Sequence, residues 1–216
     1  MDRQTLKIEI ERLEFFKYVD SKNLTKVQDG LLDNIINKKA FFFPSGDKYK
    51  NINGRLFSFD FESLTEGGAI DILKEMRPSL EKAGLNIFDL DQVFNSETKS
   101  RKPIYTITIN DMNCSLSNIP SIPFLLDGLV AKKFAKFLNT TLRKNKITER
   151  IYFINDSASD TELAFLTSKQ VNFINSLNLN PNDKPYKFTF WTIFKPSMQI
   201  VVLIIRALFK KKANSA

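Results

Sequence analysis

The sequence predicts an α+β fold with a mostly antiparallel sheet, packed helices and a basic, apolar C-terminal segment. Strand-like and helix-like segments alternate irregularly, without the regular βαβ order of a parallel sheet. Two short apolar runs flank a turn at residues 110–113, which indicates a β-hairpin. At 216 residues the chain is long enough for one full domain. We therefore expect one α+β domain over residues 1–180 and a distinct segment over residues 187–216.

Two amphipathic helices are expected at the start of the chain. The first covers residues 5–19, although the alternation over residues 7–11 also allows a short strand. The second covers about residues 23–38, where Gly30 lowers helix stability by roughly 1 kcal/mol relative to Ala. The apolar faces are Leu6, Ile10, Leu13 and Phe16 in the first helix, and Leu24, Val27, Leu31, Leu32, Ile35 and Ile36 in the second.

Residues 55–62 show the clearest strand pattern in the sequence. Strict alternation places its side chains on two opposite faces. One face holds Phe57, Phe59 and Phe61, and the other holds Ser58, Asp60 and Glu62. A turn at residues 65–68 leads into a helix in which Pro78 introduces a kink or a restart and which Gly84 ends.

The second half of the chain predicts further strands around one long helix. A weaker strand over residues 86–93 precedes a strand over residues 104–109 and its hairpin partner. After Pro123, apolar residues recur every four positions from Leu126 to Leu142, as in a long helix. Two short apolar runs then read as buried strands, at 151–154 and 163–166. Thr167 and Gln170 have the spacing of a capping box, which predicts that a helix begins there.

The net charge of +8 is concentrated at the C-terminus. The whole chain has 32 basic and 24 acidic residues, and residues 187–216 hold six of the basic ones and no Asp or Glu. The remaining 186 residues therefore have 26 basic and 24 acidic side chains. A nearly neutral body does not have the electrostatic footprint of a nucleic-acid-binding domain, so nucleic acid is not expected as a partner.

Histidine is absent, and Cys114 is the only cysteine. These two facts exclude Ser-His-Asp and Cys-His catalysis, histidine-ligated metals, internal disulfides and cysteine-based zinc sites. We expect no cofactor. The first residues lack the apolar stretch of a secretory signal, so a cytoplasmic location is expected, with membrane association through the C-terminus as an open alternative.

Acidic residues at two places are the candidate binding site. Asp60 and Glu62 are spaced i, i+2 on the predicted strand, about 7 Å apart, which suits acid–base chemistry or a hard metal ion. The solvent face of a half-buried strand gives the same pattern. The second place is the polar loop that follows the strand at 151–154, with Asp156, Asp160 and Glu162 as its candidate contacts.

The C-terminal segment has three interpretations. Residues 200–209 would form a helix of about 15 Å, half of a hydrocarbon core, whereas residues 188–209 are long enough to span it but are interrupted by Lys195 and Pro196. A strand followed by a packed helix, a membrane-surface or tail anchor, and a docking helix all remain open. Contacts with a membrane or partner would come from Trp191, Ile204, Arg206, Phe209, Lys210, Lys211 and Lys212.

Residues 104–187 resemble small bacterial immunity-type proteins that accompany polymorphic toxins. The resemblance is carried by the runs Tyr105–Asp111, Phe137–Asn139, Glu149–Tyr152 and Ala164–Thr167. It implies a non-catalytic protein that sequesters one toxin by covering its active surface. We therefore expect a protein-binding module. A membrane-peripheral or tail-anchored protein, and a metal-dependent phosphoester enzyme that uses Asp60 and Glu62, are the alternatives.

Overall fold

The structure is a computed structural model that describes residues 1–41, 53–95, 104–116, 123–154 and 161–187. Its helices are α1 (Arg3–Arg12), α2 (Leu24–Asp33), α3 (Phe61–Thr65), α4 (Ala69–Lys82), α5 (Pro123–Lys144) and α6 (Ser168–Ser176). Its strands are β1 (Leu56–Phe59), β2 (Leu90–Asn95), β3 (Ile104–Ile109), β4 (Met112–Ser115), β5 (Arg150–Ile154) and β6 (Thr161–Leu166). Shorter helical turns are Ser21–Asn23, Asn34–Lys38 and Pro181–Asp183. The predicted α+β class is confirmed.

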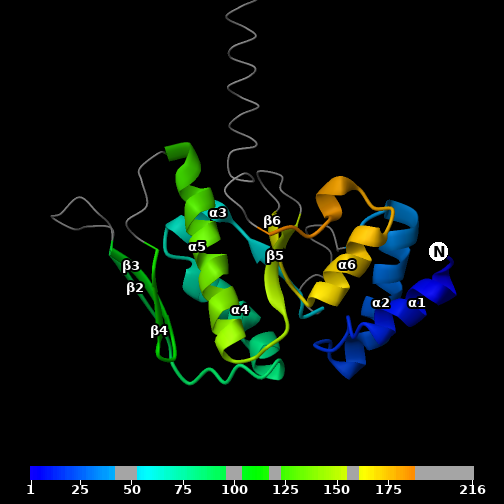
Figure 1. The fold of residues 1–216 in the computed structure, drawn as a ribbon, viewed down its shortest axis with the longest axis horizontal. Helices are drawn as coiled ribbons and strands as arrows, with labels where there is room; N and C mark the ends of the chain where they lie inside the picture. The colour runs from blue at the N-terminus through cyan, green and yellow to red at the C-terminus, as the bar shows by residue number, and fades with distance from the viewer. Residues whose placement is uncertain (42–52, 96–103, 117–122, 155–160, 188–216) are drawn as a thin grey trace, which may run out of the picture.

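The strands form two antiparallel sheets in the described part of the chain. The first sheet has the order β1-β6-β5 and lies between two groups of helices, with α1, α2 and α6 on one side and α3, α4 and α5 on the other (Figure 1). The second sheet has the order β2-β3-β4 and lies beyond α4 and α5, at one end of the molecule (Figure 1). The first sheet is therefore internal, whereas the second has helices against one face only among the elements that the structure describes.

The internal position of the first sheet explains the unbroken apolar runs of β5 and β6. Alternate side chains enter different cores because a strand directs successive residues to opposite faces. Ile151, Phe153, Leu163 and Phe165 join the core that contains α4 and α5. Tyr152, Ile154, Ala164 and Leu166 join the core that contains α1, α2 and α6.

The second sheet follows the two-sided pattern of an exposed antiparallel sheet. Tyr105, Ile107 and Ile109 on β3 are buried against the helices, while Thr106 and Thr108 lie on the other face. The hairpin predicted at residues 110–113 is confirmed, with Met112 opposite Ile109 in β4. The preceding strand, expected over 86–93, begins later, at Leu90.

The first helix ends earlier than its pattern predicts. It begins at the Asp2 N-cap and stops at Arg12, and Glu14 has a left-handed φ of 56°. The carbonyl oxygens of Glu14 and Phe15 thereby become free of the helix and accept hydrogen bonds from the Arg55 guanidinium, each at 2.8 Å. A tertiary interaction therefore replaces the last turns of the expected helix.

The strand predicted over residues 55–62 is wrong in its second half. The strand β1 ends at Phe59, and Asp60 is the N-cap of α3, with its carboxylate accepting hydrogen bonds from the backbone N–H groups of Glu62 and Ser63. Asp is among the best N-cap residues because its side chain satisfies the free amides of the first turn. The alternation of three phenylalanines concealed this helix start.

The predicted capping box is confirmed. The Thr167 hydroxyl accepts from the Gln170 backbone N–H, and the Gln170 side chain accepts from the Thr167 N–H at 2.8 Å. Gln170 also donates to the Leu13 carbonyl oxygen at 2.7 Å. The start of α6 is thus tied directly to the end of α1.

Candidate functional site

The acidic pair proposed from the strand pattern is not arranged as a site. Asp60 and Glu62 are both exposed, but both oxygens of Asp60 are used to cap α3, and Glu62 lies in the first turn of that helix. The i, i+2 strand geometry on which the pair depended is absent. No group of three or more potential metal ligands is found among the described residues.

The second acidic candidate is divided by the structure. Glu162 lies in β6 opposite Ser58 and Ile154 and is only 5% exposed, so its expected role as an exposed loop contact is wrong. The reason is that β6 begins at Thr161 and is the central strand of its sheet. Asp156 and Asp160 lie outside the described residues.

The candidate membrane contacts also lie outside the described residues. These are Trp191, Ile204, Arg206, Phe209, Lys210, Lys211 and Lys212. Of the helices that the structure describes, none combines the length and the apolar character required to cross a membrane. The three interpretations of the C-terminal segment stay predictions.

A buried polar network joins the N-terminal helices to the first sheet. The Arg55 guanidinium lies over the Tyr18 ring at 4.5 Å, and donates to the carbonyl oxygen of Phe165 at 2.9 Å besides those of Glu14 and Phe15. The Tyr18 hydroxyl donates to Glu149 at 2.6 Å. These contacts use the guanidinium and the phenol to hold backbone and a buried carboxylate, which is a stabilising arrangement.

The protonation states of this network follow from its burial and its hydrogen bonds. Burial raises the pKa of the Tyr18 phenol, and the adjacent Glu149 carboxylate raises it further. Burial by itself would raise the pKa of Glu149, but the hydrogen bond from Tyr18 and the charge of Lys17 at 3.6 Å lower it below the ordinary value. Glu149 is therefore ionised and Tyr18 neutral at neutral pH.

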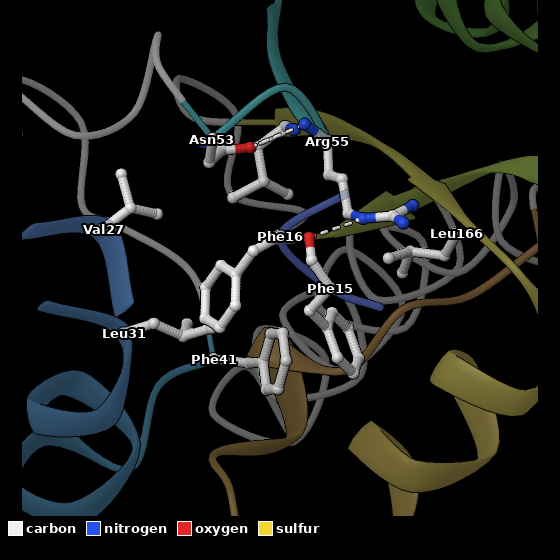
Figure 2. A pocket seen from close by; sticks show the side chains of 9 residues that line it. Phe15, Phe16, Val27, Leu31, Phe41, Asn53, Arg55 and Leu166 are labelled. Carbon is white, nitrogen blue, oxygen red and sulfur yellow. Dashed lines mark hydrogen bonds between the residues drawn. The ribbon is translucent and has the colours of Figure 1, made fainter. Parts of the chain in front are cut away.

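An apolar pocket lies beside Arg55 (Figure 2). It has a volume of about 30 Å³. Its lining is Phe15, Phe16, Val27, Leu31, Phe41, Asn53, Arg55, Leu56 and Leu166. The two polar side chains in the wall bond to backbone: Asn53 accepts from the N–H groups of Arg55 and Leu56, each at 2.7 Å. Ligand sites are roughly ten times larger or more, so this pocket has room for about one water molecule.

The most unusual surface lies on the second sheet. Among the described residues, four of the exposed large hydrophobic side chains belong to the β2–β3 hairpin and the turn that enters it. They are Phe88 at 77% exposure, Val93 at 52%, Phe94 at 37% and Ile104 at 48%. Val93 and Ile104 share the outer face of the sheet and are called the hairpin surface below, whereas Phe94 lies on the face of Tyr105 and Phe88 precedes the strand. Scattered exposed apolar residues are normal in monomers, but a local group of them marks an interaction surface.

The hairpin surface is held in place by the neighbouring turn. The Gln92 side chain donates to the Gly67 carbonyl oxygen at 2.6 Å and accepts from the Ile70 N–H at 3.0 Å. The Phe94 ring meets the Tyr105 ring edge-on, with centroids 5.2 Å apart. Phe94 also lies so close to Gly67 that a Cβ there would be 3.1 Å from the ring. The backbone that presents these side chains is therefore rigidly supported.

Val93 and Ile104 lie on the outer face of the sheet, away from the helices. Val93 is opposite Thr106 and Ile104 is opposite Asn95, so the two apolar side chains occupy diagonal positions on that face. The sequence offered one signal for this surface: Ile104 precedes Tyr105 and breaks the alternation of a half-buried strand. The sequence interpretation did not use it.

These features define a two-sheet α+β protein whose exposed hydrophobic group lies on an outer hairpin. Searches of protein-family models, of curated proteins and of solved structures each gave no match to this chain.

Proposed function

We propose that this protein is a non-catalytic protein-binding module of the immunity type, which docks through its hairpin surface and covers the active surface of a bacterial toxin. The exposure of Val93 and Ile104 at diagonal positions on the outer face of one hairpin is the observation that carries the proposal. The toxin as partner rests on the resemblance of residues 104–187 to immunity-type proteins.

The shape of the surface supports binding by coverage. Val93 and Ile104 stand on the outer face of a three-stranded sheet, opposite the face that packs against the helices. Completing the burial of a large aliphatic side chain contributes about 1.5–3 kcal/mol when it starts fully exposed. Half-exposed Val93 and Ile104 would therefore contribute on the order of 1 kcal/mol each, which is typical of the apolar centre of an interface.

The buried polar groups support a non-catalytic role. Arg55, Tyr18 and Glu149 bond to one another or to backbone, and the pocket beside Arg55 has too little space for a substrate. Asp60 caps a helix. Asp60, the first residue of the acidic pair, thus has a structural role at the start of a helix.

Co-expression with the products of adjacent genes, followed by titration of the captured partner, tests the proposal. The double change Val93→Asp with Ile104→Asp places charges at the centre of the surface and is expected to weaken binding at least a hundredfold. Ile8→Asp is the matched control, because Ile8 is also 52% exposed but belongs to α1, at the opposite end of the molecule from β2 and β3 (Figure 1). Circular dichroism verifies that all variants fold. Equal affinity of the double variant and the control would contradict the proposal.

A further inference from the structure

The two sheets have four edge strands, β1, β5, β2 and β4, and the edge at β2 differs from the other three in how its backbone groups are covered by the described residues. An edge strand exposes backbone N–H and C=O groups that attract foreign strands, so proteins cover such edges with other groups. In an antiparallel ladder, alternate residues direct these groups towards the partner strand and away from it. The hydrogen bonds around each sheet therefore show which backbone groups point outward and which of them are covered.

The edge at β5 is fully covered. Ile151 and Phe153 are the outward-directed residues, because their neighbours pair with β6. The Asn139 side chain accepts from the Ile151 N–H at 2.7 Å and donates to the Ile151 carbonyl oxygen at 3.2 Å. Tyr186 makes the equivalent pair with Phe153, both bonds at 2.9 Å. A side-chain amide and one bridging residue thus replace a further strand.

The edges at β1 and β4 are covered in part. At β1 the outward Leu56 N–H donates to the Asn53 side chain at 2.7 Å. At β4 the Leu116 N–H donates to the Tyr105 carbonyl oxygen, so the backbone of Leu116 faces β3. The backbone groups of the preceding residue, Ser115, therefore point away from β3. The Ser115 carbonyl oxygen accepts from the Lys133 ammonium group at 3.2 Å. A lysine at an edge is a common way to block strand addition.

The edge at β2 has no such cover within the described residues. The hydrogen bond from Asn110 N–H to Asp89 carbonyl, 2.8 Å long, sets the alternation along β2 and β3. Leu90, Gln92 and Phe94 therefore direct their backbone groups away from β3. The backbone hydrogen bonds of the described residues outside the ladders include none to these three. The same strand carries the exposed Val93 and Phe94.

We propose that the β2 edge binds an extended, basic segment of the partner protein as an added antiparallel strand. The inference rests on the proposed function and specifies how the hairpin surface engages its partner. Main-chain hydrogen bonds from Leu90, Gln92 and Phe94 would provide affinity, and Val93 would contact alternate side chains of the added strand.

Charge complementarity selects the basic partner. Asp89 and Asp91 are exposed at the start of β2, and Glu66 is exposed in the turn that Gln92 and Phe94 contact. These carboxylates favour Lys or Arg on the added strand. They also disfavour pairing with a second copy: the register centred on Gln92 aligns the outward positions but sets two Asp91 side chains diagonally on one face.

A short peptide of alternating Val and Lys is the probe, added to the full chain and followed by NMR hydrogen exchange. Binding is expected to slow exchange at the Leu90, Gln92 and Phe94 amides. A version N-methylated at alternate residues, which cannot donate to the edge, is expected not to bind. Asp91→Lys is expected to weaken binding about tenfold, whereas Asp29→Lys at an exposed position of α2, on the other side of the first sheet, is expected to change it less than twofold.

Two substitutions at one position separate the backbone from the side chain. Phe94→Ala removes the ring and keeps the backbone N–H. Phe94→Pro removes the ring and also the outward N–H, and a proline is tolerated at an outward position of an edge strand. We expect Phe94→Pro to bind at least tenfold more weakly than Phe94→Ala. Equal binding by the two variants or by the N-methylated peptide would overturn the inference, as would no binding of the probe.

The inference would also be overturned if the protein self-associated and the same amides were protected without peptide, because the β2 edge would then bind a second copy of this chain. The proposed function is judged separately, by the Val93 and Ile104 variants in the partner titration. One result would separate the two: the Val93 and Ile104 variants lose the partner, but the partner bound to the unchanged protein leaves the β2 amides unprotected. That result would overturn strand addition and leave the proposed function standing.

Discussion

The side-chain amide of Asn139 on α5 forms two hydrogen bonds with the backbone of Ile151 on β5: it accepts from the Ile151 N–H and donates to the Ile151 carbonyl oxygen. A single side chain thus satisfies both outward-directed groups of one edge residue. The same relationship attaches the longest helix to the internal sheet. It also explains why that edge is closed to other strands.

Loss of the Asn139 amide should destabilise the protein. In Asn139→Ala both groups of buried Ile151 lose their partner, and we expect the free energy of unfolding to fall by about 1–3 kcal/mol. Urea denaturation measures this. Asn145→Ala, at an exposed asparagine just after α5, should change it by about 0.5 kcal/mol or less. Similar losses in the two variants would show that Asn139 does not close the edge.

The planar fork of Arg55 should be irreplaceable by lysine. Lys keeps the charge but cannot reach the carbonyl oxygens of Glu14, Phe15 and Phe165 together, so Arg55→Lys leaves buried acceptors unpaired. We expect a loss of about 2–4 kcal/mol in thermal or urea unfolding. Arg12→Lys, at an exposed arginine paired with Glu9, should change stability far less, because exposed ion pairs contribute little. A mild effect at Arg55 would refute the assigned role.

The hydrogen bond from Tyr18 to Glu149 should make stability depend on pH. The folded-state pKa of Glu149 lies below its ordinary value of 4.5, so its contribution is present above about pH 4.5 and lost as the pH falls through the folded pKa. Tyr18→Phe removes the hydrogen bond that lowers the pKa of Glu149, while the burial of Glu149, which raises its pKa, remains. The variant should therefore be less stable by about 1.5–3 kcal/mol at neutral pH, with a smaller difference in acid.

Urea unfolding of both proteins between pH 3 and pH 7 measures this difference. Tyr105→Phe provides the comparison, because the Tyr105 hydroxyl accepts its hydrogen bond from the Ala69 N–H, a backbone group that does not titrate. Its effect on stability should be nearly constant over that range. A constant effect of Tyr18→Phe as well would contradict the assignment of the Glu149 pKa.

Asp60 should matter for folding and not for partner binding. Asp60→Ala removes the N-cap of α3 and should cost about 1 kcal/mol, which Asp60→Asn should largely restore. Glu62→Ala should have little effect on stability. Neither Asp60→Asn nor Glu62→Ala should change partner affinity more than twofold, and a larger loss of affinity would return these residues to the binding site.

Local sequence signals predicted the elements that depend on neighbouring residues. The Thr167–Gln170 capping box and the hairpin around residues 110–113 are formed within a few residues, and both were predicted correctly. The strand pattern at Asp60 failed because two local rules competed there. Alternating phenylalanines favoured a strand, and an aspartate that caps the next turn favoured a helix start.

The features that define the candidate site depend on contacts that are distant in sequence. Glu162 looked like a loop residue, and only its pairing between β1 and β5 buries it. Whether a sheet edge is open depends on groups such as Asn139 and Tyr186, which are 12 and 33 positions from the backbone groups that they cover. Periodicity carries no information about such cover.

Amide hydrogen exchange of the free protein, followed residue by residue by NMR, tests the central claim most directly. The outward amides of Ile151 and Phe153, covered by Asn139 and Tyr186, should be strongly protected. The outward amides of Gln92 and Phe94, in an equally regular strand, should exchange orders of magnitude faster if the β2 edge is open for a partner. Protection of Gln92 and Phe94 equal to that of Ile151 and Phe153 would contradict the account.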